Sequence, residues 1–174
     1  MTPPPRVPSS DSDLRERLDR TFVALRRQFE QLELAFEPWR GADGHREFNA
    51  TYDSDDPEER NRAELVHANF ERCHQLTRDS IELAAKLAER VERLPKPGKE
   101  EDRIAVMVRE GVLTAGDETL MREQVIVRNE SQHAYVYTGA DQIYEAVERQ
   151  LAHGRALVGR VAAFAEQLRR DDER

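Results

Sequence analysis

The apolar residues of this chain recur at steps of three and four, the spacing that places side chains on one face of an α-helix. The pattern is strongest in residues 14–36, 63–94 and 143–168. Shorter stretches of the same kind run over 104–108 and 120–128. No alternating stretch is long enough to predict a strand, so the spacing predicts an all-α fold.

The breaks between these stretches carry recognisable helix signals. Pro38 is expected to end the first helix, and residues 56–59, Asp-Pro-Glu-Glu, combine a capping carboxylate, a proline and two acids at a helix start. The helix that follows is expected to run unbroken to Pro95. Residues 39–56 contain two glycines and an acidic run. We expect them to form a long loop or an insertion.

Two signals set the outer limits of the folded part. Residues 1–11 hold four prolines and two serines without apolar periodicity, which predicts a disordered tail. Residues 12–171 are expected to form a single helical domain, because a chain of 174 residues can bury a core of its own. Within it, Thr114 can cap a helix together with Asp117 three residues on.

Composition and charge narrow the possible functions. With 36% charged and 38% hydrophobic residues, the helices are expected to complete their burial against a second copy, as a homodimer. No apolar run approaches the roughly 20 residues of a membrane span, and the first residues lack the apolar core of a secretion signal. We therefore expect a cytoplasmic protein without membrane contact. The net charge of −8 disfavours broad electrostatic capture of nucleic acid, so any RNA contact must be local.

The strongest chemical signal is the run 128–135, Arg-Asn-Glu-Ser-Gln-His-Ala-Tyr. Arginine holds phosphate oxygens, histidine moves protons near neutral pH, and tyrosine offers a modifiable hydroxyl. On a regular helix Arg128 and His133 lie about 140° apart. Both can reach one phosphate only if the helix end loosens or a second subunit supplies one of them.

Spacing alone does not single out this run. The pattern arginine, four residues, histidine also occurs from Arg40 to His45 and from Arg62 to His67. A zinc site at His67, Cys73 and His74 is disfavoured, because adjacent residues face different ways and no fourth ligand has suitable spacing. We therefore expect no metal and no cofactor.

At residues 128–135 the chain resembles the HEPN ribonucleases, specifically the toxin of the HEPN/MNT toxin–antitoxin type. The motif of that group reads arginine, a polar residue that is often asparagine, three more residues, histidine, any residue and tyrosine. Arg128, Asn129, His133 and Tyr135 match it, and the resemblance covers about residues 60 to 168. It implies a HEPN-like bundle of four or five helices, with paired active sites at a dimer interface.

The resemblance also implies a function for each motif residue. His133 and Arg128 would cleave RNA without metal, leaving a 2′,3′-cyclic phosphate, and Asn129 would orient the histidine or the phosphate. Tyr135, with Tyr137 as a lesser candidate, would accept AMP from a partner MNT nucleotidyltransferase that silences the toxin. This implies the toxin of a toxin–antitoxin or phage-defence pair.

Two other interpretations stay open at the level of sequence. The first is a noncatalytic HEPN-like helical module that binds a nucleotidyltransferase or another protein partner. The second is a helical adaptor without a role in nucleic-acid chemistry. In both, Arg128 would pair with an acid such as Glu130, and His133 and Tyr135 would be interface residues.

Overall fold

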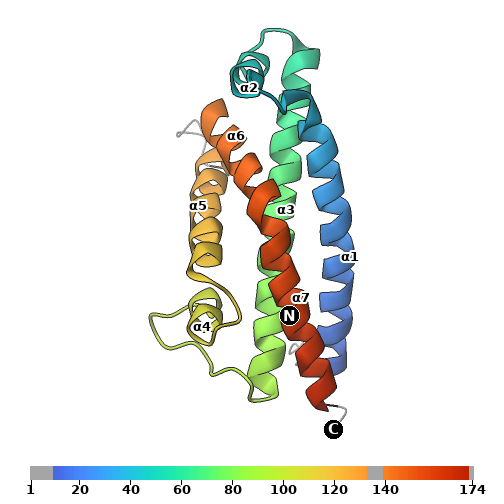
Figure 1. Ribbon diagram of the computed structural model, residues 1–174, viewed down its shortest axis with the longest axis vertical. Helices are drawn as coiled ribbons and strands as arrows, with labels where there is room; N and C mark the ends of the chain where they lie inside the picture. The colour runs from blue at the N-terminus through green and yellow to red at the C-terminus, as the bar shows by residue number, and fades with distance from the viewer. Residues whose placement is uncertain (1–9, 133–138, 173–174) are drawn as a thin grey trace, which may run out of the picture.

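The computed structural model of the chain describes residues 10–132 and 139–172, with the backbone alone for 125–132 and 172. All regular elements of this part are helical, which confirms the all-α prediction. Figure 1 shows α1 (Asp11–Phe36), α3 (Pro57–Arg90) and α7 (Arg155–Asp172) as long neighbouring helices. The flanking helix α5 (Ala115–Gln132) lies beside them, with α2 (Gly44–Tyr52) at one end of the bundle.

The first helix has the predicted periodicity but begins earlier than expected. The Ser10 hydroxyl accepts a hydrogen bond from the Asp13 amide at 3.1 Å and caps α1. The predicted disordered tail was therefore wrong for its last two positions, while residues 1–9 lie outside the described part. Pro38 falls in a short 3-10 turn (η1, Glu37–Trp39) directly after α1, which confirms that the helix ends there.

The long helix α3 starts as its sequence predicts and stops before Pro95. The Asp56 carboxylate accepts a hydrogen bond from the Glu58 amide at 2.8 Å. At the other end Glu92 adopts a left-handed backbone with φ of 57°, and the Arg93 amide donates to the carbonyl of Ala88 at 2.8 Å. This turn ends the helix at Arg90 without a glycine or a proline.

Residues 39–56 do not form the long loop that the sequence predicted. They contain α2, whose Phe48 is completely buried and packs edge-on against Trp39, with ring centroids 5.2 Å apart. Phe36 and Tyr144 also lie against the Phe48 ring. The prediction was wrong because the glycines lie before and at the start of α2, where they do not interrupt it.

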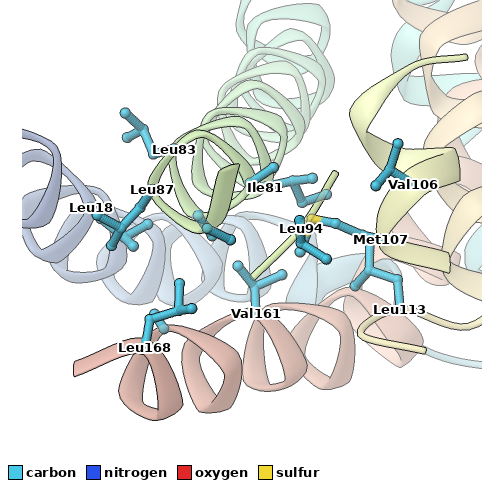
Figure 2. Packing of buried hydrophobic residues seen from close by; sticks show 14 of the residues in the cluster. Leu18, Ile81, Leu83, Leu87, Leu94, Val106, Met107, Leu113, Val161 and Leu168 are labelled. Atoms are coloured by element: carbon cyan, nitrogen blue, oxygen red, sulfur yellow. The ribbon is translucent and has the colours of Figure 1, made fainter. Parts of the chain in front are cut away.

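Two hydrophobic clusters fill the bundle. One joins the first half of α1, the end of α3, α4 (Arg103–Arg109), the start of α5, and α7, and Figure 2 shows its side chains meeting between these helices. The other joins the second half of α1, α2, the start of α3 and α6 (Ala140–Arg149). Phe22 and Val158 pack against both clusters and connect them.

The last predicted helix is divided by a π-helical turn, Gln150–Gly154, between α6 and α7. Gly154 is buried, and a Cβ there would meet the Gln150 side chain at 2.9 Å and the Phe29 ring at 3.0 Å. Such turns insert one residue into a helix, and they occur frequently at functional sites. Here the turn directs the Gln150 side chain into the interior, where it is completely buried.

The packing of α2 predicts that Gly44→Ala is destabilising. A Cβ at Gly44 would collide with the Trp39 carbonyl and approach the Tyr144 hydroxyl at 3.1 Å. We expect the free energy of unfolding to fall by about 2–3 kcal/mol and Tm by roughly 5–10 °C. Gly41→Ala is the matched control, since nothing lies within 4 Å of its Cβ position. Thermal denaturation followed by circular dichroism measures both, and equal Tm values would contradict this packing.

Candidate functional site

The motif run 128–135 lies across the end of α5. Arg128 and Asn129 belong to the last turns of this helix, whose backbone is described as far as Gln132. His133 and Tyr135, like the lesser candidate Tyr137, lie outside the described residues. The described contacts nearest to the motif are those that hold α5 and the start of α6.

The start of α5 is tied to α7 by Asp117. The Asp117 carboxylate accepts hydrogen bonds from the Thr114 amide and hydroxyl, each at 2.8 Å, and the Asp117 amide donates to the Thr114 hydroxyl at 3.2 Å. This is the predicted capping pair. The Arg160 guanidinium donates to the two carboxylate oxygens at 2.8 and 2.5 Å. Burial would raise the pKa of Asp117, but the bonds from Arg160 and Thr114 outweigh it and lower that pKa.

The middle of α5 is fixed by a buried polar network. The Gln124 carbonyl oxygen lies 3.0 Å from Nδ1 of His74, and the Gln124 amide donates to the Gln150 side chain at 2.6 Å. The Gln150 amide in turn contacts the Thr77 hydroxyl and the Cys73 sulfur, each at 3.4 Å. All five side chains are buried. The network therefore joins α3, α5 and the π-helical turn one helical turn before the motif.

The same network accounts for the cysteine. Burial raises the pKa of the Cys73 thiol to about 12, so the group is a thiol rather than a thiolate near neutral pH. His67 lies in a different setting, with its Nε2 atom 3.6 Å from the Glu71 carboxylate. Burial lowers the pKa of His67, while the charges of Glu71 and Glu64 oppose that shift.

The two other arginine–histidine pairs of the same spacing are not assembled as pairs. Arg40 contacts the carboxylates of Glu33 and Glu37 at 3.0 and 3.4 Å. His45 instead lies on α2 with Nε2 2.8 Å from an Asp141 carboxylate oxygen. In the second pair, Arg62 and His67, the histidine lies near the Glu71 carboxylate.

Sequence reasoning missed a polar cluster where α2 meets α6. The Asp141 carboxylate contacts His45 and also accepts a hydrogen bond from the Asn49 amide. The His45 ring stacks on Tyr144, with centroids 4.6 Å apart and planes at 25°. Tyr144 is buried and donates a hydrogen bond from its hydroxyl to the Trp39 carbonyl at 3.1 Å. Since α2 was expected to be a loop, no sequence signal placed His45 beside Asp141.

The comparisons with known proteins identify no relative: no family model, no curated protein and no solved structure matches the chain. Within residues 10–132 and 139–172, no helix is long and apolar enough to cross a bilayer. In the same residues, no group of three or more His, Cys, Asp or Glu side chains is arranged to hold a metal ion. A function must therefore be inferred from the end of α5 and the contacts around it.

The Asp117 contacts predict a pH-dependent contribution to stability. Because the folded-state pKa of Asp117 is lowered, its contribution is present above the unfolded pKa near 3.9 and is lost as pH falls through the folded value. We expect Asp117→Asn to lower the free energy of unfolding by about 1–3 kcal/mol at pH 7. The difference from wild type should shrink below about pH 4.

Urea denaturation between pH 3 and pH 7 measures this difference, at roughly one pH unit per step. Asp55→Asn is the matched control, because it removes the same charge from an exposed position. It should change the free energy of unfolding by less than about 0.5 kcal/mol. A loss in Asp117→Asn that is equal at all pH values would contradict the assigned role of the carboxylate.

Proposed function

We propose that this chain is a HEPN-type, metal-independent endoribonuclease, the toxin of a toxin–antitoxin or phage-defence pair. The observation that carries the proposal is the combination of Arg128, Asn129, His133 and Tyr135 in the sequence, with Arg128 and Asn129 in the last turns of α5. An all-helical bundle supports it, as does the firm attachment of α5 through Asp117 and the Gln124 network. A catalytic group needs such a rigid base to stay in position.

The proposed reaction uses the RNA's own 2′-hydroxyl as the nucleophile. The 2′-oxygen forms a bond to phosphorus while the bond from phosphorus to the 5′-oxygen breaks. His133 takes the proton from the 2′-hydroxyl, and Arg128 stabilises the negative charge of the phosphorane. Asn129 orients the histidine or the phosphate by a hydrogen bond. The products are a 2′,3′-cyclic phosphate and a free 5′-hydroxyl.

The proposed active form is a homodimer. A spacing of five residues separates Arg128 and His133 by about 140° on a regular helix, and a second copy can supply the missing group. Tyr135 is the proposed acceptor of AMP from an MNT nucleotidyltransferase, which would add negative charge beside the phosphate site and repel RNA. The proposed place of action is the cytoplasm.

RNA cleavage in the presence of EDTA tests the proposal. Wild type is expected to cleave, and Arg128→Ala and His133→Ala are each expected to lose at least about 100-fold in rate. Arg62→Ala and His153→Ala are the matched controls, since they remove an exposed arginine and an exposed histidine elsewhere. They should cleave like wild type. Product ends are read by gel mobility before and after acid opening of the cyclic phosphate.

Two results would contradict the proposal. If unmodified, dimeric wild type cleaves none of several RNA pools, the noncatalytic module that binds a protein partner becomes the better interpretation. If wild type cleaves and both motif variants keep full activity, the nuclease site lies elsewhere in the chain.

A further inference from the structure

A cavity of about 1020 Å³ lies at the end of the bundle opposite the last turns of α5. It is lined by the start of α1, the end of α3 and the turn that follows α3. Figure 1 shows these segments together at one end of the molecule, with α2 and the end of α5 at the other. The cavity is therefore separate from the proposed nuclease site.

The described lining of this cavity is basic, although the chain as a whole is acidic. The chain has 35 acidic residues against 27 lysines and arginines. The lining instead has two acidic residues, Glu89 and Glu92, and five basic ones: Arg17, Lys86, Arg90, Arg93 and Lys96. A concave surface with one sign of charge focuses the electrostatic field and attracts ions of the opposite sign. The cavity is thus expected to attract anions.

The acidic residues of this region do not cancel its positive charge. Arg103 of α4 donates hydrogen bonds to both carboxylate oxygens of Glu89, at 2.7 and 3.1 Å. The same guanidinium contacts Glu82 at 3.1 Å, the carboxylate that Lys86 contacts at 3.5 Å. Arg103 thus neutralises acidic charge on α3 from outside the cavity. Among the described lining residues, Glu92 is the carboxylate without an ion pair.

Several of the basic side chains are available to a ligand. Within the described part of the chain, neither Arg17 nor Lys96 forms an ion pair. Arg90 and Arg93 each contact an exposed carboxylate, at 3.1 and 2.9 Å. Exposed ion pairs are weak because water and salt screen them, so an anion in the cavity can compete for both arginines.

Buried apolar side chains form the inner wall of the cavity. Leu14, Leu83 and Leu94 line it and belong to the hydrophobic cluster that α1 and α3 share. Lysine and arginine lay their aliphatic stems along such a surface and keep their charged ends in water. The charged ends are therefore distributed around the cavity, and an anion with several charges along its length can contact more of them than a single phosphate can.

From this surplus of positive charge we propose that the cavity binds a small molecule that carries a chain of phosphate groups. Arginine and lysine are the side chains that hold phosphate oxygens by charge-assisted hydrogen bonds. Arg17 from α1 and Lys96 from the turn after α3 hold the chain from two separate segments. Inorganic polyphosphate and an organic polyphosphate ester share this chemistry. The inference does not depend on the proposed function.

Isothermal titration calorimetry of the full chain with inorganic tripolyphosphate tests the site, in a phosphate-free buffer with EDTA. We expect one tripolyphosphate per chain and a Kd that rises with salt, because the contacts are ionic. Orthophosphate is expected to bind at least about 10-fold more weakly, since it reaches fewer cations. ATP separates the two sources: tighter binding than tripolyphosphate identifies an organic ester, and equal or weaker binding identifies the inorganic chain.

Five variants place the binding in this cavity. Arg17→Ala and Lys96→Ala are each expected to weaken tripolyphosphate binding about 3- to 10-fold. Glu92→Gln should instead tighten it about 2- to 3-fold, because it removes a negative charge from the lining. Arg62→Ala and Lys99→Ala are the matched controls, since they remove exposed cations that do not line the cavity. They should bind like wild type.

Three results would overturn the inference. The first is no binding of tripolyphosphate by wild type at about 1 mM. The second is an unchanged affinity in both Arg17→Ala and Lys96→Ala, with folding confirmed by thermal denaturation. The third is an equal loss in the two control variants, because the anion would then be attracted by surface charge in general. Since RNA cleavage is measured separately, this inference and the proposed function can fail independently.

Discussion

The structure depends on a buried amide contact between Gln124 on α5 and Gln150 in the π-helical turn. Burying an amide side chain is costly unless its donors and acceptors are paired. Gln124 pairs with both Gln150 and His74, and it can do so only at one rotation of α5 about its axis and one position of α5 along α3. Apolar packing alone would tolerate small slips of α5 along α3. Together with the Asp117–Arg160 ion pair at the start of the helix, the network fixes the part of α5 from Asp117 to Gln124 against α3, α7 and the π-helical turn.

Two groups of polar residues come from separate parts of the sequence. Arg128 and Asn129 belong to the last turns of α5, while His45 on α2 contacts Asp141 at the start of α6. The opposite half of the bundle is filled by the leucine-rich cluster seen in Figure 2. The end that carries α2 and the start of α6 is packed by the second cluster, so each end of the bundle has a hydrophobic core of its own.

Much of the fold could be predicted from local patterns, because helix periodicity and capping act between residues close in sequence. The extent of α1 up to Phe36 and the Asp56 start of α3 are examples. Two features that depend on tertiary contacts were missed. The helix α2 is stabilised by the burial of Phe48, and the π-helical turn depends on the close packing of Gly154 against the Gln150 side chain. For the site, the sequence located Arg128 on a helix end, but no local rule pairs His45 with Asp141.

The proposed function requires RNA to bind at the end of α5. The most direct measurement is a titration of isotope-labelled protein with a short RNA whose 2′-hydroxyls are replaced by hydrogen, so that it binds without being cleaved, followed by NMR. We expect shifts concentrated at His45, Asn49 and Asp141 and in the motif run 128–135. Shifts confined to the opposite end, around Arg17, Arg90 and Arg93, or no shifts at saturating RNA, would contradict it.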